Sequence, residues 1–178
     1  MKKLTFTGLA TIGLALFIGT ASGQMAPFGN DEDKDYASAL WKVLETDRLI
    51  GKGAINTVPY EGIEPHGFVL ETLISKATVN GHTGDVVVKR NYGPEGVEVD
   101  AVKADRAKHL KAITVMFRRE AGFDSDNQDW FWVKYLPDGT LDENPKGMAL
   151  AGKIAKGSDT GCIACHLGAD GDDYLFVN

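Results

Sequence analysis

The pentapeptide Cys162-Ile163-Ala164-Cys165-His166 decides how the rest of the sequence is interpreted. Its C-x-x-C-H pattern is the signature of covalent attachment of a c-type haem. Two thiols three positions apart on a short helical turn can each form a thioether with one vinyl group of the same porphyrin, and the following histidine then ligates the iron. The motif therefore predicts one covalent haem c, held by Cys162 and Cys165, with His166 as the proximal iron ligand.

Two other kinds of site also use a C-x-x-C pair. A thioredoxin-like redox pair usually lies at the start of a helix after an early strand, whereas Cys162 and Cys165 come late in the sequence. Half of a zinc site would need two further soft ligands at similar spacing, and the chain has only two cysteines. Because both thiols are assigned to the haem, we expect no disulfide.

The start of the chain is typical of a secretory signal peptide. Lys2 and Lys3 form a basic region, residues 9–18 form an apolar run, and small residues end at Gly23. We expect residues 1–23 to be cleaved near Gly23, which leaves a periplasmic protein with no membrane attachment. An uncleaved anchor is the alternative, but the apolar run is shorter than the ~20 residues that a membrane span needs.

Length and charge limit the organisation and the partners of the mature protein. The formal charge of −6 becomes −8 when Lys2 and Lys3 are removed. An acidic surface disfavours nucleic acid and anionic lipid as partners but suits a basic redox partner protein. The 178 residues allow one ordinary domain. We expect a flexible acidic leader at residues 24–34 and a mono-haem domain at residues 35–178.

Hydrophobic periodicity predicts one helix followed by a sheet. Residues 35–45 carry an apolar stripe at helical spacing. Runs rich in β-branched and aromatic residues predict strands at 67–74, 85–92, 112–118 and 129–136. Residues 97–102 are predicted to be a weak edge strand or a loop. The expected fold class is α+β, with a predominantly antiparallel β-sheet, an N-terminal helix and a short C-terminal haem-binding helix.

Several motifs follow one another in an order that is more informative than any one of them. They are HGFV at 66–69, VVVKRNY at 86–92, ITVMF at 113–117, GFD at 122–124, DWFWVKY at 129–135, GCIACH at 161–166 and DYLF at 173–176. This ordered set, over about residues 36–178, resembles the cytochrome P460 family. The resemblance implies a mostly antiparallel β fold, a homodimer, one covalent haem per chain, and a five-coordinate iron bound by His166 with an open distal side.

The family has two branches, and the resemblance implies a different chemistry for each. Cytochromes P460 carry an additional covalent bond from a lysine to the porphyrin and oxidise hydroxylamine. Cytochromes c′-beta lack this bond, have an apolar distal pocket often capped by phenylalanine, and bind nitric oxide or carbon monoxide. Lys89 stands at the position of the cross-linking lysine, and strand alternation directs either Lys89 or Arg90 towards the haem, but not both. A lysine that faces solvent or pairs with a haem propionate is the alternative for Lys89. Phe68 is the candidate distal cap, with ordinary sheet core as its alternative.

A base near the iron would favour the enzymatic branch, because hydroxylamine oxidation releases protons. Resemblance to the hydroxylamine-oxidising members would imply a distal carboxylate on the strand at 112–118, but that strand contains no acidic residue. Glu71 on the first strand is the candidate substitute, and a solvent-facing role is its alternative. The sequence therefore leaves a hydroxylamine-oxidising enzyme and a gas-binding protein about equally supported.

A six-coordinate electron-transfer cytochrome is the alternative function. Met116 or Met148 would then supply the second axial ligand beside the histidine. His66, His82 and His109 are further candidates for a sixth ligand, but the open distal side that the resemblance implies argues against them.

Overall fold

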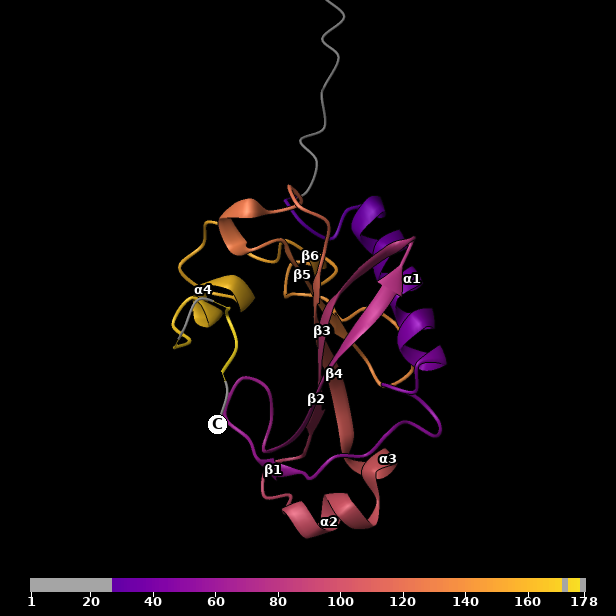
Figure 1. The fold of residues 1–178 in the computed structure, drawn as a ribbon. Coiled ribbons are helices and arrows are strands. Elements are labelled where there is room, and N and C mark those ends of the chain that lie inside the picture. The colour runs from indigo at the N-terminus through magenta and orange to yellow at the C-terminus, as the bar shows by residue number, and fades with distance from the viewer. Residues whose placement is uncertain (1–26, 171–172, 177–178) are drawn as a thin grey trace, which may run out of the picture.

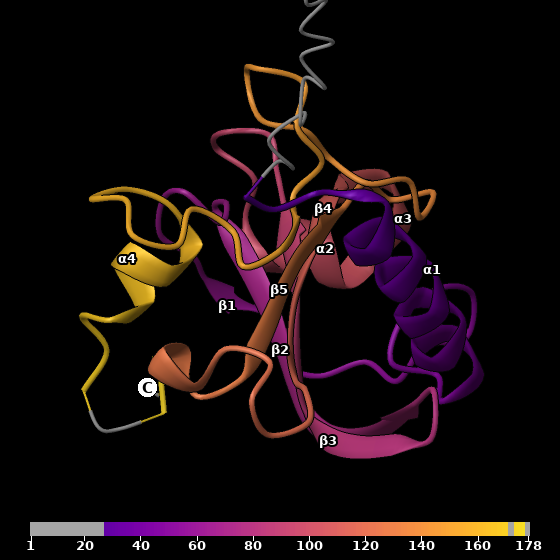
Figure 2. The same cartoon turned by 90° about the horizontal axis from the view of Figure 1, so that it is seen from above.

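The computed structural model describes residues 27–170 and 173–176, and it confirms the expected α+β class. Helix α1 (Asp31–Thr46) covers one face of an antiparallel sheet, and the short helix α4 (Cys162–His166) lies on the other face (Figures 1 and 2). The sheet order β1-β2-β3-β4-β5-β6 follows the chain. The strands are β1 (Tyr60–Glu61), β2 (Val69–Val79), β3 (His82–Tyr92), β4 (Leu110–Arg118), β5 (Trp130–Tyr135) and β6 (Ala151–Gly152).

The first helix begins at Asp31 rather than at residue 35. The side chain of Asn30 accepts a hydrogen bond from the Asp33 amide at 3.0 Å, and the Asp33 carboxylate accepts one from the Asn30 amide at 3.4 Å. This reciprocal pair is a capping box, and the acidic first turn interacts favourably with the helix dipole. Part of the stretch that we predicted to be a flexible leader is therefore helical, while the predicted signal peptide at residues 1–23 lies outside the described residues.

A two-residue turn fixes the register of the central hairpin. Asn80 and Gly81 have φ values of 50° and 85°, as in the type I′ turns that match the twist of antiparallel strands. Val79 therefore pairs with His82, and the ladder continues to the pair Val69 and Tyr92. This register decides which side chains of β2 and β3 share a face.

Strand alternation divides the apolar residues between two cores. The core under α1 contains Leu40 and Leu44 of the helix with alternate residues of β3, β4 and β5, namely Val86, Val88, Ile113, Val115, Phe117, Phe131, Val133 and Tyr135. The core on the α4 face contains the intervening residues of the same strands, namely Val87, Met116, Trp130 and Trp132, together with Ile163 of α4. The predicted strands and their two-faced pattern are thus confirmed.

The segment at residues 97–102 is not an edge strand. It contains the start of helix α2 (Val99–Ala104), which is followed by the short helix α3 (Arg106–His109). Val102 is fully buried in a small cluster with Val69 and Tyr92, and Val99, three positions earlier, packs against the same cluster. This helical spacing defines the buried face of a segment that we predicted to be a weak edge strand or a loop. Among the helices that the structure describes, none is long and apolar enough to cross a membrane.

Candidate functional site

Helix α4 brings both cysteines and His166 to one cavity of about 350 Å³. This volume is typical of small-molecule and cofactor pockets, which span roughly 300–1,000 Å³. The helix starts after Gly161, whose φ of 113° favours glycine. A Cβ atom at Gly161 would also lie 2.6 Å from the Cβ of Ala155. The local backbone therefore requires a glycine directly before Cys162.

The ring of His166 is held in one orientation by its surroundings. Its Nδ1 atom lies 2.6 Å from the backbone oxygen of Tyr174, and because a carbonyl can only accept, Nδ1 carries the proton. The other ring nitrogen, Nε2, is then the one available to a metal, as in most histidine ligands with an outer hydrogen bond. Trp132 and Phe176 pack edge-on against the ring, at centroid distances of 4.9 and 5.3 Å. Burial lowers the pKa of His166, which favours the neutral form that binds metal.

Lys89 reaches the same cavity from β3. The alternation prediction is confirmed, because Lys89 lines this cavity while the adjacent Arg90 lies on the opposite face with the loop after α1. Burial lowers the pKa of the Lys89 amine, which favours the neutral, nucleophilic form. Within the described part of the chain, Lys89 forms no ion pair with a carboxylate. Lys134, also on the cavity wall, is paired with Asp142 at 2.8 Å.

The residues around the cavity fit a haem group. The indole Nε1 of Trp132 is buried and has no hydrogen-bond partner among the described residues, so an acceptor from a bound group would satisfy it. Lys89 and Lys134 both line the cavity, and their amines can donate hydrogen bonds to propionate groups. Burial raises the pKa of Cys162 to about 11, as expected for a thiol enclosed with an apolar group.

The comparisons with known proteins give one match. The family model described as Cytochrome P460 matches residues 69–177. The chain belongs to the cytochrome P460 family. Cytochromes of the P460 family carry haem, and the matched region contains Lys89, Cys162, Cys165 and His166. Neither the curated proteins nor the solved structures contain a match to this chain.

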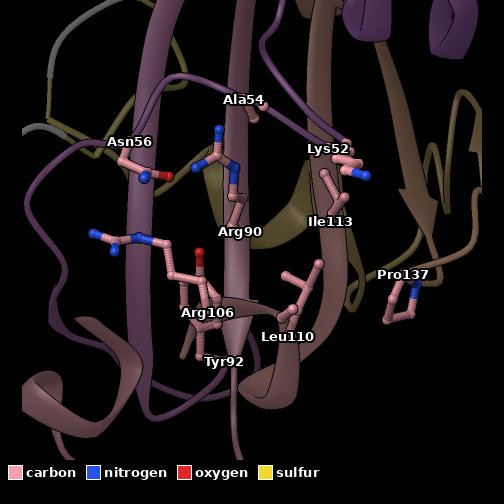
Figure 3. Close-up of a pocket in the computed structure, with 12 residues that line it drawn as sticks. Lys52, Ala54, Asn56, Arg90, Tyr92, Arg106, Leu110, Ile113 and Pro137 are labelled. Carbon is pink, nitrogen blue, oxygen red and sulfur yellow. The ribbon is translucent and has the colours of Figure 1, made fainter. Parts of the chain in front are cut away.

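Glu71, the predicted substitute for a distal base in this P460 domain, lies on the wrong face of the sheet. Its fully buried carboxylate pairs with Arg90 Nη1 at 3.2 Å and Arg106 Nε at 2.9 Å, and it accepts a hydrogen bond from the Tyr92 hydroxyl. Arg90, Tyr92 and Arg106 line a different pocket of about 540 Å³ (Figure 3). That pocket contains neither cysteine, so Glu71 is part of a structural charge network and not of the candidate site.

The predicted distal cap is also misplaced. Phe68 precedes β2, is 37% exposed and does not line the cavity of Cys162. The phenylalanine that does line it is Phe176, near the end of the described chain. The loop before β2 instead contributes His66, whose ring centre is 6.0 Å from that of His166. Burial, together with the neighbouring Lys89, His166 and Lys134, lowers the pKa of His66 to about 4.

Proposed function

We propose that this P460 family protein is an exported cytochrome with one covalent haem c, whose iron meets nitric oxide or hydroxylamine at the coordination position opposite His166. The observation that carries the proposal is the meeting of two thiols and an oriented imidazole in one cavity. Haem bound there supplies an iron centre that small nitrogen species can coordinate. The basic start and apolar run of residues 1–23 support export to the periplasm.

Each residue of the site has a defined task in this proposal. Cys162 and Cys165 would each add their S–H bond across one vinyl group of the porphyrin, the sulfur bonding one vinyl carbon and the hydrogen the other, and the two thioethers would fix the cofactor to α4. His166 binds the iron through Nε2, because the Tyr174 carbonyl holds the proton on Nδ1. Trp132 closes one side of the His166 ring and excludes water from it.

Binding of a neutral gas is the chemistry that the cavity supports best. Among the described residues that line it, none is an aspartate or a glutamate. Strand β4 contributes Thr114 and Met116, two alternate residues, to the cavity wall. Apolar surface is added by Ile74, Val87 and Trp132. An apolar site without a carboxylate favours an uncharged diatomic over a reaction that must lose protons.

Hydroxylamine oxidation is the second candidate because of Lys89. A desolvated lysine facing the two thiol positions is what a cross-link to the porphyrin would require. An electron-transfer role with a methionine ligand is the third, since Met116 also lines the cavity.

Covalent haem is tested by producing the full chain in a host that carries out c-type haem ligation. We expect a coloured protein whose haem remains attached under denaturing conditions, with a mass equal to the mature chain plus one haem. A colourless product, or haem that is lost on denaturation, would contradict the proposal.

Peptide mapping then separates the two branches. After proteolysis, a haem peptide that contains Cys162–His166 joined to the Lys89 peptide would establish the cross-link, and a haem peptide without Lys89 would favour gas binding. Lys89→Arg should keep the haem in both cases, but should restore an ordinary c-type spectrum only if the cross-link exists. Lys134→Arg is the matched control, because Lys134 lines the same cavity.

A further inference from the structure

One histidine of the cavity lies outside the region that the family model matches. His66 belongs to the loop between β1 and β2, whereas the matched region starts at residue 69. The loop is held in place by a hydrogen bond from the His66 amide to the Ile63 carbonyl at 3.1 Å. Its imidazole nevertheless lines the same cavity as Cys162, Cys165 and His166. The family match therefore says nothing about the role of this side chain, which has to be argued from its position in the cavity.

The separation of the two imidazoles matches that of two ligands on one metal. The ring centres of His66 and His166 are 6.0 Å apart and the ring planes are at 87°. A histidine nitrogen binds a transition metal at about 2 Å and the ring centre lies roughly 1 Å beyond it, so two rings on opposite sides of one metal have centres about 6 Å apart. A ligand molecule between His66 and the iron would require a longer separation than the one observed.

The same ring nitrogen is available on both histidines. In His166, Nδ1 is taken by the Tyr174 carbonyl at 2.6 Å. In His66, Nδ1 lies 3.4 Å from the hydroxyl of Thr114, a residue of β4 that faces the cavity. Outer hydrogen bonds of this kind orient histidine ligands and leave Nε2 for the metal. On both imidazoles the hydrogen bonds among the described residues therefore use Nδ1 and leave Nε2 for a metal.

We propose that His66 is the second axial ligand of the haem iron when no external molecule is bound. Nitric oxide or carbon monoxide then binds by displacing it: one iron–nitrogen bond to neutral His66 breaks, one bond to the neutral incoming molecule forms, and no proton or electron is needed. The inference rests on the proposed function, because it requires haem at Cys162 and Cys165. It replaces the expected five-coordinate resting iron with a site that an internal ligand closes.

The spin state of the haem-loaded protein tests this directly. We expect low-spin ferric and ferrous spectra for the wild type, with a near-infrared charge-transfer band typical of two imidazole ligands. His66→Ala should retain its covalent haem and become high-spin, and added imidazole should restore the low-spin spectrum. Carbon monoxide should bind the ferrous His66→Ala protein at least tenfold faster than the wild type. His82→Ala is the matched control, because His82 bonds the Arg118 carbonyl at 3.1 Å and does not line the cavity.

The outcomes separate this inference from the proposed function. A high-spin wild type, or a low-spin spectrum that survives His66→Ala and therefore comes from Lys89 or Met116, would overturn the assignment of His66 while leaving the haem proposal standing. Absence of covalent haem from the wild type would instead overturn the proposed function. If His66→Ala does not fold, the near-infrared band of the wild type alone still decides between two imidazoles and a lysine or methionine ligand.

Discussion

Lys89 and Arg90 are neighbours on β3, yet they have opposite environments. Arg90 Nη1 bonds the Glu71 carboxylate at 3.2 Å, and its Nη2 donates to the carbonyls of Leu49 and Ile55 at 2.9 and 2.7 Å. Lys89, one residue earlier, lies in the cavity of the two thiols and forms no ion pair within the described residues. The cation on the α1 face is thus paired within the chain, whereas the amine on the α4 face has no carboxylate partner among the described residues.

This difference indicates which face stabilises the fold and which one carries function. On the α1 face, the buried hydroxyl of Tyr135 donates to the Ala37 carbonyl at 2.7 Å, and Glu71 has three partners. On the α4 face, the buried indole nitrogens of Trp130 and Trp132 have no partner among the described residues. Unpaired buried groups cost stability, and one of them also occurs on the α1 face, at the hydroxyl of Tyr36. Of the unpaired groups among the described residues, Trp132 is the one that lines the cavity, where an acceptor from a bound group would satisfy it.

The largest effect is expected from removing both thiols. The double variant Cys162→Ala/Cys165→Ala should lose all thioether-bound haem, because no other cysteine exists in the chain. The α1 core lies on the other side of the sheet and contains neither cysteine, so the far-ultraviolet circular dichroism should keep its β signature. Haem staining of a denaturing gel and the circular dichroism spectrum check the two halves of this prediction. A haem-free chain with no sheet signal would show that the two faces are not independent.

Truncating a large core side chain on the α1 face should lower the stability of the fold and leave the haem in place. Phe131 is fully buried and packs against Tyr36 and Phe123, with ring centroids 5.0 and 6.0 Å away. Phe131→Ala should lower the free energy of unfolding by about 3–5 kcal/mol, the usual cost of deleting a core aromatic ring. Urea unfolding of the haem-loaded protein measures it, and the haem spectrum of the folded variant should stay unchanged. Ile74→Ala is the control, since Ile74 is 62% exposed on the cavity face and should cost far less.

The Glu71 network should affect stability without affecting ligand binding. Glu71→Gln removes the negative charge that faces Arg90 and Arg106. Removing one partner of a buried ion pair costs on the order of 3 kcal/mol, because the remaining charges stay buried and uncompensated. We expect this loss in urea unfolding, together with an unchanged carbon monoxide spectrum and association rate. A changed ligand spectrum would contradict the separation of the two faces and would return Glu71 to the functional site.

The register of the hairpin explains why Glu71 was wrongly predicted to lie in the cavity that Lys89 lines. Alternation along a single strand predicts that Lys89 and Arg90 face opposite ways, but it does not relate β3 to β2. The Asn80-Gly81 turn does so, because it pairs Val79 with His82 and thereby places Glu71 opposite Arg90 and Thr72 opposite Lys89. Applied to the sequence, the strong hairpin preference of Asn-Gly would have excluded Glu71 from the Lys89 face.

Other features depend on tertiary contacts that no local pattern reveals. Phe68 and His66 lie in or beside the same loop, and both are compatible with either a surface or a cavity position. The structure turns His66 into the cavity and leaves Phe68 outside its lining. Likewise, Val99 and Val102 fit a short strand or a helix equally well until their burial against the cluster of Val69 and Tyr92 decides. The C-x-x-C-H motif can be recognised without knowledge of tertiary contacts, because its chemistry requires only five consecutive residues.

The smallest effect concerns the rim of the α1 face, where Arg119 lies over the ring of Tyr36 at 3.8 Å. Arg119 also bonds the Glu120 carboxylate at 2.5 and 3.0 Å, and these bonds lower the pKa of Glu120 to about 2. A carboxyl group with a lowered pKa in the folded state stabilises it above the ordinary pKa of about 4.3, and this stabilisation is lost as the pH falls towards 2. Because the Glu120 side chain is 51% exposed, solvent limits the contribution to under about 1 kcal/mol.

Glu120→Gln should therefore lower the free energy of unfolding at neutral pH by roughly 0.5 kcal/mol. The difference from the wild type should shrink as the pH falls from about 4.5 to about 2.5, because protonation of Glu120 removes the same charge from the wild type. Urea unfolding of both proteins at several pH values measures this difference. A difference that stays constant into acid would show that Glu120 acts by packing rather than by charge.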